Sequence, residues 1–582
     1  MPKIELQEAS FFEMLGIPPK AGKDHGERPT RQEFAELLEV AKAEIDDWQP
    51  EENSLKIELN DTNRPDLWSG PGLVRQLRAF REGRVPQYTF MSTEGDPRES
   101  AERVIRVDKA LKKIRPYIAA FIARGAPVTD AMLVEMINSQ EKLCWNFGRK
   151  RSTIAMGVYR ADLMKFPVHY RAADPEATRF TPLDYSWEMS LREILKTHPK
   201  GQEFGWIIEN FERFPYLEDD QGQTLSMPPI INSAHLGAVE VGDSHHFVEL
   251  TGPDLDSLLV ACSIVACDFA DLGYEILPVR VEYPFDTTYG RQIVTPFYFQ
   301  RPVSLEVGEA SRLLGEQIDA KEAEACVRRM GNQVSRSGNT LTVSPPPYRN
   351  DFLHPVDVIE EVMIGRGMSS FEPMWPEEFT VGRLSEIEHF SREVREILVG
   401  QGYQEMIYSY LGSRRDFVER MNTGGEDLIE IANPMSESLE VLRNSQLPNL
   451  LYSESVSSNA VYPHRIFEVG KVACLAEEEN YGSRTVTALS FLSCDREAGF
   501  NDVNSHLAAV FFYLSREYTL ELLEDSRFIP GRAGAVVYKG RTIGVIGEIH
   551  PSVLENWGVQ QPAAAGEIQL DAILEIDGEE GR

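Results

Sequence analysis

The sequence predicts a multidomain α+β protein, and three observations support this prediction. The chain has 582 residues, more than one hydrophobic core usually organises. Hydrophobic residues make up 42% of it, which is enough for several such cores. Regions with different helix and strand patterns follow one another without an internal repeat. We therefore expect four domains, at 1–90, 91–297, 298–376 and 377–582.

The first region alternates helix and strand patterns, as an N-terminal α/β structural domain does. The segment Asn60–Asp66 (NDTNRPD) is rich in turn-forming residues. Ser69 followed by Gly70 and Pro71 predicts a helix start, because serine caps helices and proline is tolerated in the first turn. The simplest interpretation of Asn60–Asp66 is a structural turn before this helix.

The second region has a mixed α/β pattern. The segment Phe247–Thr251 (FVELT) predicts a strand on which Glu249 and Thr251 share one face. A buried helix is expected next, beginning after Asp254 and ending before Gly273.

The third region is expected to be a compact unit. The pattern predicts a strand at Val303–Val307 and a helical turn at Glu309–Leu314. Asp319 is expected to cap the next helix, with Glu322 completing a capping box. Ser337–Asn339 predicts a hairpin turn. This order predicts a small winged, helix-turn-helix-like domain, a type that binds nucleic acid in some proteins and docks other proteins elsewhere.

The fourth region predicts one α+β domain. Its first helix carries apolar residues on one face and ends near Gly400. Strands are expected at Met406–Leu411, Arg465–Val469, Ala535–Tyr538 and Thr542–Ile546. Helices between such strands indicate a largely antiparallel sheet, which we expect helices to cover on one face.

The composition predicts a cytoplasmic protein with no membrane partner. The longest apolar run, Leu258–Cys267, is about half the length needed to cross a bilayer, and the first ten residues do not resemble a signal peptide. Six cysteines are scattered without a CxxC pair. That pattern fits reduced thiols rather than a zinc site or a disulfide framework.

The net charge of −33 argues against a protein whose main task is to grip nucleic acid. Binding to phosphates requires clustered Lys and Arg. Short basic clusters occur at Arg103–Arg115 and at Gly148–Arg151 (GRKR). Any nucleic-acid contact is therefore expected to be confined to such patches or to be carried by a partner.

Four carboxylates stand close together in the sequence near the end of the third region. Asp357, Glu360 and Glu361 are spaced i, i+3 and i+4, which places them on one side of a helix, and Asp351 lies six residues upstream. Converging carboxylates repel unless a cation lies among them, and oxygen ligands alone favour magnesium or calcium. The alternative is a solvated acidic first turn that the helix dipole stabilises. The spacing alone leaves both open.

The segment Tyr348–Glu361, followed by Gly365–Gly367, is similar to the metal-carrying domain of phenylalanyl-tRNA synthetase β subunits of the archaeal and eukaryotic type. The magnesium-binding carboxylates of that family match four residues here in identity and spacing: Asp351, Asp357, Glu360 and Glu361. The resemblance therefore implies Mg²⁺ as the ligand of these four side chains.

Other segments resemble the same family in the same order, so the resemblance covers nearly the whole chain. They are Asn63–Asp66; then Gln140–Leu143, Gly148–Arg151, Pro228–Ser233 and Glu249–Asp254, which resemble its editing domain; and Asn433–Pro434, Leu442–Arg443, Arg465–Gly470, Pro530–Arg532 and Gly547–Pro551, which resemble its class II catalytic-like domain. One departure is Tyr159–Leu163, where the family usually has a more compact His-Asp-Leu or Tyr-Asp-Leu.

The fourth region resembles a class II synthetase core but lacks the residues that hold ATP there. Arg465 and Glu468 are three apart rather than two, and no Gly-x-Gly-x-x-Arg segment occurs near the end of the sequence. Without these guanidinium groups the triphosphate loses its main electrostatic stabilisation. The resemblance thus implies a non-catalytic domain that packs against a separate α subunit. In an α₂β₂ assembly, that subunit would bind phenylalanine and ATP and charge tRNA for phenylalanine.

The second region resembles a domain that hydrolyses mischarged Tyr-tRNA. Such a site is needed because a pocket for phenylalanine rejects tyrosine only about a hundredfold. In this interpretation Glu249 accepts a hydrogen bond from the phenol, while Asn232, Ser233 and Thr251 orient the ester or the water. The alternative is that Glu249 and Thr251 lie on the solvent-exposed face of a strand.

Two functions of other classes are also weighed. The first is a nucleic-acid-binding regulator built on the winged domain; the charge of −33 argues against it, as do Glu322 and Glu324 on its second helix. The second is a free-standing tRNA-editing hydrolase. It differs from the synthetase interpretation in one observable, whether the chain acts without an α subunit.

Overall fold

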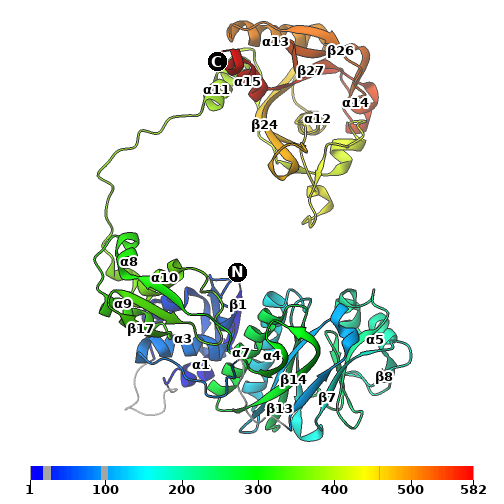
Figure 1. Ribbon diagram of the computed structural model, residues 1–582. Helices are drawn as coiled ribbons and strands as arrows, with labels where there is room; N and C mark the ends of the chain where they lie inside the picture. Colours follow the sequence, from blue (N-terminus) through cyan, green and yellow to red (C-terminus); the bar gives the residue numbers. More distant parts are fainter. Residues whose placement is uncertain (1, 18–27, 94–101, 458, 581–582) are drawn as a thin grey trace. The chain divides into compact units, whose positions relative to one another are not determined.

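The computed structural model describes residues 2–17, 28–93, 102–457 and 459–580. The chain divides into two compact units, Met1–Met374 and Trp375–Arg582 (Figure 1). Within the described stretches, no helix is both long enough and apolar enough to span a membrane. The finer division into four domains stays a prediction.

In the described part of the N-terminal region, helices pack around a three-stranded antiparallel sheet of order β1-β3-β2. Its elements are β1 (Lys3–Gln7), α1 (Glu8–Met14), α2 (Arg31–Leu38), β2 (Ala43–Gln49), β3 (Ser54–Leu59) and α3 (Gly70–Glu82). The Ser69 hydroxyl accepts a hydrogen bond from the backbone N–H of Gly72, which confirms the predicted start of α3. The preceding segment is more than a surface turn, because Arg64 and Asp66 are buried and ion-paired at 2.8 Å.

The middle of the first unit is built on a ten-stranded sheet among the described residues. Its order is β12-β11-β10-β7-β4-β14-β5-β13-β6, and β15 pairs with β14. The strands are β4 (Val104–Val107), β5 (Tyr117–Arg124), β6 (Ala155–Arg160), β7 (Val168–Ala173), β10 (Phe214–Glu218), β11 (Thr224–Met227), β12 (Ile231–Asn232), β13 (His245–Gly252), β14 (Glu275–Thr287) and β15 (Gly290–Thr295). A separate pair is formed by β8 (Arg179–Phe180) and β9 (Met189–Ser190).

Helices accompany this sheet. They are α4 (Asp130–Lys142), α5 (Leu191–Thr197), α6 (Pro199–Phe204) and α7 (Leu255–Asp271). The predicted buried helix is confirmed as α7, which is capped by Asp254 and packs on β5 and β13 with most of its side chains out of solvent. α5 and α6 belong to a smaller core of their own with β10 and β11.

The predicted strand at Phe247–Thr251 is confirmed as part of β13, which is paired antiparallel with both β5 and β6. Both faces of β13 are covered, since seven of its eight residues are buried. Glu249 is 3% exposed and Thr251 is 0% exposed. The alternative that places these side chains on a solvent-exposed face is therefore wrong.

The last part of the first unit has the element order that the sequence predicts. Its elements are β16 (Val303–Glu306), α8 (Val307–Leu314), α9 (Ala320–Arg329), β17 (Gln333–Ser337), β18 (Thr340–Ser344) and α10 (Pro355–Arg366), with the sheet in the order β16-β18-β17. Asp319 caps α9 through its carboxylate. The predicted capping box does not form, because the Glu322 carboxylate lies 3.3 Å from Arg366 Nε instead. The winged character of this region stays a prediction.

The second unit is an α+β domain around a seven-stranded sheet among the described residues, in the order β19-β23-β24-β28-β27-β26-β25. The strands of this sheet are β19 (Gln404–Glu405), β23 (His464–Leu475), β24 (Ser483–Cys494), β25 (Thr519–Leu522), β26 (Phe528–Tyr538), β27 (Arg541–Ile549) and β28 (Ala563–Gln569). The helices are α11 (Glu386–Gly400), α12 (Leu447–Val456), α13 (Phe500–Tyr513), α14 (Pro551–Trp557) and α15 (Leu570–Glu580). A small sheet joins β20 (Leu411–Gly412), β22 (Val441–Leu442) and β21 (Ile429–Glu430).

Two expectations for this unit are wrong. Helices cover both faces of the sheet: α11, α13 and α15 pack on one core, whereas α12 and α14 pack on a second core that uses the alternate side chains of the same strands. The strand expected at Met406–Leu411 is limited to β19 before it and β20 at its end, since residues 406–410 make no regular ladder.

Candidate functional site

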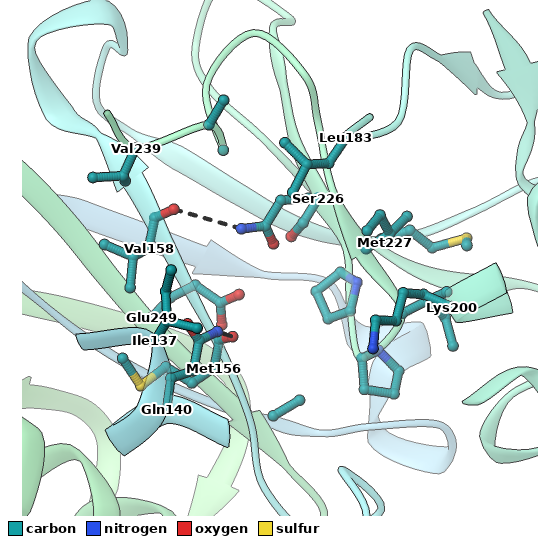
Figure 2. Close-up of a pocket in the computed structure, with 18 of the residues that line it drawn as sticks. Ile137, Gln140, Met156, Val158, Leu183, Lys200, Ser226, Met227, Val239 and Glu249 are labelled. Atoms are coloured by element: carbon teal, nitrogen blue, oxygen red, sulfur yellow. Dashed lines mark hydrogen bonds between the residues drawn. The ribbon is translucent and has the colours of Figure 1, made fainter. Parts of the chain in front are cut away.

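A cavity of about 350 Å³ lies among α4, β6, β11 and β13 in the first unit (Figure 2). Its walls are largely apolar, with side chains such as Met136, Ile137 and Val158. Polar groups are few, and they include Gln140, Ser226, Asn232, Glu249 and Lys200. In Figure 2, Lys200 lies across the cavity from Val158. An apolar concavity with a few polar side chains is typical of a small-ligand site.

Glu249 is the buried acid of this cavity. Its Oε1 accepts a hydrogen bond from the Tyr159 hydroxyl at 2.9 Å, and its buried Oε2 has no hydrogen-bond partner among the described residues. Burial raises the pKa of Glu249 to about 7, although the Tyr159 hydrogen bond and the nearby charge of Arg115 act in the opposite direction. A buried oxygen without a partner costs free energy, so a ligand that donates a hydrogen bond to Oε2 would be favoured.

The Tyr159 hydroxyl connects Glu249 to the opposite wall. It lies 2.8 Å from Ser226 Oγ, 2.9 Å from Glu249 Oε1 and 3.4 Å from Asn232 Oδ1. Gly157 leaves room for it, because a Cβ at this position would come within 2.2 Å of the hydroxyl oxygen. Tyr159 therefore fixes one oxygen of Glu249, while the other, Oε2, is buried and has no hydrogen-bond partner among the described residues.

The four predicted editing residues are only partly brought together. Glu249 and Asn232 line the cavity, and Asn232 Nδ2 lies 3.5 Å from the carbonyl oxygen of Val158. Ser233 is buried outside the lining, where its Oγ accepts from the backbone N–H of Leu236. Thr251 is also outside the lining. Its Oγ1 accepts a hydrogen bond from Arg115 Nε at 2.9 Å.

Sequence reasoning missed Ser226, which lines the cavity, and Tyr159, which lies outside the lining but contacts Glu249 through its hydroxyl. Ser226 is a lone serine on a short strand, and no motif or spacing marks it. Tyr159 stands at the start of the segment that departs from the family pattern, so the resemblance assigns it no role. Only the pairing of β6 with β13, which sets Val158 opposite Val248 and Gly157 opposite Glu249, brings Tyr159 beside the acid.

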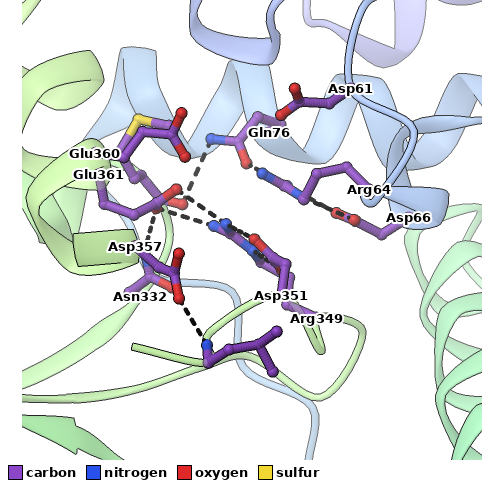
Figure 3. A network of polar contacts seen from close by, with 12 residues as sticks. Asp61, Arg64, Asp66, Gln76, Asn332, Arg349, Asp351, Asp357, Glu360 and Glu361 are labelled. Atoms are coloured by element: carbon purple, nitrogen blue, oxygen red, sulfur yellow. Dashed lines mark hydrogen bonds and ion pairs between the residues drawn. The ribbon is translucent and has the colours of Figure 1, made fainter. Parts of the chain in front are cut away.

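The predicted metal carboxylates lie in a second polar network, centred on Arg349 (Figure 3). Arg349 is 3% exposed, and its Nη1 and Nη2 donate to the two oxygens of Glu361 at 2.9 Å each. Its Nε donates to Asp351 Oδ1 at 3.0 Å. Burial alone would raise the pKa of Asp351, but the positive charge and hydrogen bonds of Arg349 outweigh it and hold that pKa well below its usual range.

The other two carboxylates have different partners. Asp357 Oδ2 accepts from the backbone N–H groups of Leu353 and His354 at 2.7 Å each, at the start of α10. Glu360 Oε1 lies 2.6 Å from Lys42 Nζ, which also pairs with Asp61. The network thus links α10 to the N-terminal region of the same unit.

This arrangement does not fit a divalent cation. Among the described residues no group of three or more Asp, Glu, His or Cys side chains is placed to hold a metal ion, and the guanidinium of Arg349 takes the position between Asp351 and Glu361. Four oxygen ligands could converge only if Arg349 withdrew from its buried site.

The second unit contains a buried ion pair at Glu468, the residue that the sequence analysis compares with an Arg-x-Glu pair. Arg443 is 1% exposed and donates to both oxygens of Glu468, at 2.9 and 3.0 Å. Arg465 is three residues from Glu468 on β23, so the two side chains point to opposite faces of the sheet. The carboxylate of Glu567 on β28 also has hydrogen-bond partners within the unit. It accepts from the hydroxyls of Ser445 and Ser490 and from the backbone N–H of Gln446.

Known proteins resemble this chain over its whole length. It is 45% identical over 577 residues to the phenylalanine–tRNA ligase β subunit of Borreliella burgdorferi strain ZS7, covering 99% of this chain and 100% of the relative. It is 42% identical over 575 residues to that of Borrelia turicatae strain 91E135, with the same coverage. The chain belongs to the phenylalanine–tRNA ligase β-subunit family.

Family models and a solved structure agree with this assignment. The model of the phenylalanyl tRNA synthetase beta chain CLM domain matches residues 374–570, and that of the tRNA synthetase B5 domain matches residues 303–368. An N-terminal fragment of the phenylalanyl-tRNA synthetase β subunit from Pyrococcus horikoshii matches with a TM-score of 0.56 and 32% identity, over 63% of this chain and 100% of the fragment.

As a phenylalanine–tRNA ligase β subunit, the chain is a component of an aminoacyl-tRNA synthetase that serves protein biosynthesis. The B5 match contains Arg349 and all four predicted metal carboxylates. The CLM match contains the Arg443–Glu468 pair. The cavity around Glu249 lies outside both of these models and inside the first unit.

Proposed function

We propose that this β subunit hydrolyses tyrosine that has been attached by mistake to tRNA for phenylalanine, and that the cavity around Glu249 is the site of hydrolysis. One observation carries the proposal: Glu249 Oε2 is buried, lacks a hydrogen-bond partner in the described part of the chain, and belongs to a cavity residue. The phenol of a tyrosyl group would donate to this oxygen. The apolar wall around Met136 and Ile137 would contact the aromatic ring.

The same geometry would reject the correct product. Phenylalanine has no hydroxyl, so its entry would leave Glu249 Oε2 buried and still unpaired. Sites built to bond a hydroxyl reject the analogue that lacks it by a large factor. Asn232 and Ser226 offer the polar atoms that would orient the ester or an attacking water.

The proposal is tested by Glu249→Ala in the enzyme reconstituted with its candidate α chain. We expect Tyr-tRNA to accumulate, while the rate of Phe-tRNA synthesis stays unchanged, because charging uses another site. Glu218→Ala is a matched control, since this glutamate pairs with Arg171 in the same domain and does not line the cavity. Unchanged clearance of tyrosine in Glu249→Ala would remove Glu249 from the site.

We further propose that adenylation takes place on a separate α subunit, in a cytoplasmic α₂β₂ tetramer that binds tRNA for phenylalanine, with phenylalanine and ATP on the α chain. The occupied Arg443–Glu468 pair and the opposite orientation of Arg465 support a non-catalytic role for the second unit. Charging assays and native mass with and without the α chain test this proposal. Tyr-tRNA hydrolysis by this chain alone, with no complex formed, would favour a free-standing editing hydrolase.

Three finer assignments remain predictions. The archaeal and eukaryotic type is supported by the Pyrococcus fragment, whereas the curated relatives named above come from Borreliella and Borrelia. The winged character of 298–376 is supported by its element order. Magnesium binding by Asp351, Asp357, Glu360 and Glu361 is opposed by the position of Arg349, and no step of the proposed reaction depends on it.

A further inference from the structure

One helix of the first unit, α4, lies between the cavity around Glu249 and the N-terminal region. Its Ile137 and Gln140 side chains line the cavity (Figure 2). Glu135 and Asn138 lie on the opposite side of the same helix, as 3.6 residues per turn requires, and face β1 of the N-terminal region. The position of α4 therefore sets how far this wall of the cavity stands from Glu249.

The packing between α4 and the N-terminal region is loose. Two hollows of about 500 and 820 Å³ lie between them, and Glu5, Leu6, Glu135 and Asn138 line both. Apolar contacts hold a helix weakly across such gaps, because atoms that face a void lose their dispersion partners. A polar contact is therefore needed to fix this side of α4.

Glu135 provides that contact. Its Oε1 accepts a hydrogen bond from the backbone N–H of Gly70 at 2.7 Å, and the hydroxyl of Ser139 donates to the same oxygen at 3.1 Å. Gly70 is the first residue of α3, so the carboxylate also lies at the positive end of that helix dipole. The described residues provide no other hydrogen bond or ion pair between α4 and residues 1–90.

The start of α3 is itself fixed against the sheet of the cavity. Ser69, which caps α3, donates to Asp268 Oδ2 at 2.7 Å, and Arg75 forms ion pairs with Asp268 and Asp271. Both aspartates belong to α7, which packs on β5 and β13. The contacts thus form a continuous series from β13 through α7 and α3 to Glu135 on α4.

From this series of contacts we propose that Glu135 is a positioning residue for the hydrolysis of Tyr-tRNA. By accepting the N–H of Gly70, its carboxylate holds α4 at a fixed distance from β13 and so sets the width of the space that receives the aromatic ring. The proposal rests on the hydrolysis proposed above. Glu135 does not line the cavity, so it acts only through α4.

The test is Glu135→Ala in the enzyme reconstituted with its candidate α chain. We expect KM for Tyr-tRNA hydrolysis to rise about tenfold while kcat changes less than about twofold, because the displaced wall contacts the ring rather than the ester. Glu135→Gln should restore most of the wild-type KM, since its amide oxygen can still accept from Gly70. A KM that glutamine does not restore, or a fall in kcat alone, would contradict the positioning role.

Gly70→Ala tests the same contact from the other side. The added Cβ would lie 3.0 Å from Glu135 Oε1, close enough to displace the carboxylate. Alanine is a better helix former than glycine, so α3 itself should not be weakened. We expect KM to rise in Gly70→Ala, but the same change in the Glu135→Ala background should have no further effect. Losses that simply add in the double variant would contradict a shared contact.

Asn138→Ala is the matched control. Asn138 lies on the same side of α4 and lines the same two hollows, and its side chain forms no hydrogen bond with any other described residue. This variant should leave KM unchanged.

Hydrogen exchange of backbone amides gives a measurement that does not depend on hydrolysis. Glu135→Ala should lower the protection of α4 at least about tenfold, as the loss of one hydrogen bond to a charged group predicts, and leave that of β13 unchanged. Equal losses of protection in α4 and β13 would show general destabilisation and contradict a local role.

The positioning role and the proposed function fail in different ways. If the wild type hydrolyses no Tyr-tRNA, the proposed function is wrong, and the role of Glu135 in that reaction is wrong with it. If the wild type hydrolyses Tyr-tRNA but Glu135→Ala behaves like Asn138→Ala in both KM and hydrogen exchange, only the positioning role is wrong.

Discussion

The cavity around Glu249 and the network around Arg349 both bury carboxylates in the first unit, but they satisfy them differently. Glu249 Oε2 has no partner among the described residues, and burial raises the pKa of this group to about 7. Glu361 instead receives both guanidinium Nη atoms of Arg349 and the amide of Asn332, at 2.6 to 2.9 Å. The buried carboxylate of Glu249 thus lacks part of its hydrogen bonding, whereas that of Glu361 has partners on both oxygens.

This difference separates a site that awaits a ligand from one that holds the fold together. A buried carboxylate that remains unpaired is costly unless a bound group completes it. A carboxylate paired with a buried guanidinium is already satisfied, and a metal would have to displace that partner. The comparison predicts function at Glu249 and a structural role at Arg349.

The largest effect is expected from Arg349→Met. It leaves Asp351 and Glu361 buried without their cation, which should destabilise the first unit by about 3–5 kcal/mol. Denaturant unfolding measures this loss. Arg336→Met, which breaks the exposed pair with Glu324, is the control and should cost no more than about 1 kcal/mol.

Magnesium sharpens this first test. If Mg²⁺ restores the stability of Arg349→Met but does not affect the wild type, the carboxylates can form a metal site only after the guanidinium is removed. A wild type that gains stability with Mg²⁺ would contradict the structural interpretation, because a ligand that binds the folded state must stabilise it.

The next effect is a pH dependence at Glu249. Its folded pKa of about 7 lies above the ordinary value of 4.5, so the folded protein keeps a proton that the unfolded chain releases between these pH values. The contribution of this group to stability is therefore present at low pH and is lost as pH rises to about 7. Relative to the wild type, Glu249→Gln should gain up to about 3 kcal/mol between pH 4.5 and 7.5.

The dependence of stability on pH that we expect from Asp351 has the opposite sign, so this residue serves as an internal comparison. Its folded pKa is lowered, so its contribution is present above about pH 4 and is lost as the pH falls below that value. The stability difference between wild type and Asp351→Asn should shrink toward low pH. Thermal unfolding across pH measures both variants, and parallel profiles for the two would contradict the account of the cavity.

A smaller effect is expected from Tyr159→Phe. Removing the hydroxyl frees Glu249 Oε1 as well, so the carboxylate loses its fixed orientation and its pKa rises further. We expect Tyr-tRNA hydrolysis to fall about tenfold, as one hydrogen bond to a charged group predicts, with the pH profile displaced to higher pH. A lower rate with an unchanged pH profile would show that Tyr159 only supports the fold.

The smallest effect is expected from Lys42→Met. Lys42 and Glu360 are 30% and 46% exposed, so their ion pair should contribute no more than about 1 kcal/mol. Urea unfolding beside Arg349→Met would show whether the buried centre of the network dominates. Equal losses of stability in Lys42→Met and Arg349→Met would contradict a dominant contribution from the buried centre.

Local features could be predicted from the sequence. The caps at Ser69, Asp254 and Asp319 begin helices as expected, because capping depends on residues within one turn. The spacing of Asp357, Glu360 and Glu361 correctly places them on one helix. The family could also be identified from motifs, because several segments that resemble one family in the same order along the chain are specific to that family.

Features that depend on distant segments could not be predicted. Helices on both faces of the second sheet, the burial of β13 and the position of Ser226 all result from pairing between strands far apart in the sequence. Arg349 stands inside the motif used to predict a metal site. Its role as the counter-charge becomes visible only when the fold brings it onto Glu361.

The most direct test of the account is the ratio of the hydrolysis rates of Tyr-tRNA and Phe-tRNA, each as kcat/KM, for the reconstituted enzyme. We predict that the wild type strongly favours Tyr-tRNA and that Glu249→Ala brings the ratio close to one, mainly by slowing the tyrosyl reaction. A ratio that stays at the wild-type value in Glu249→Ala would contradict recognition of the phenol by Glu249.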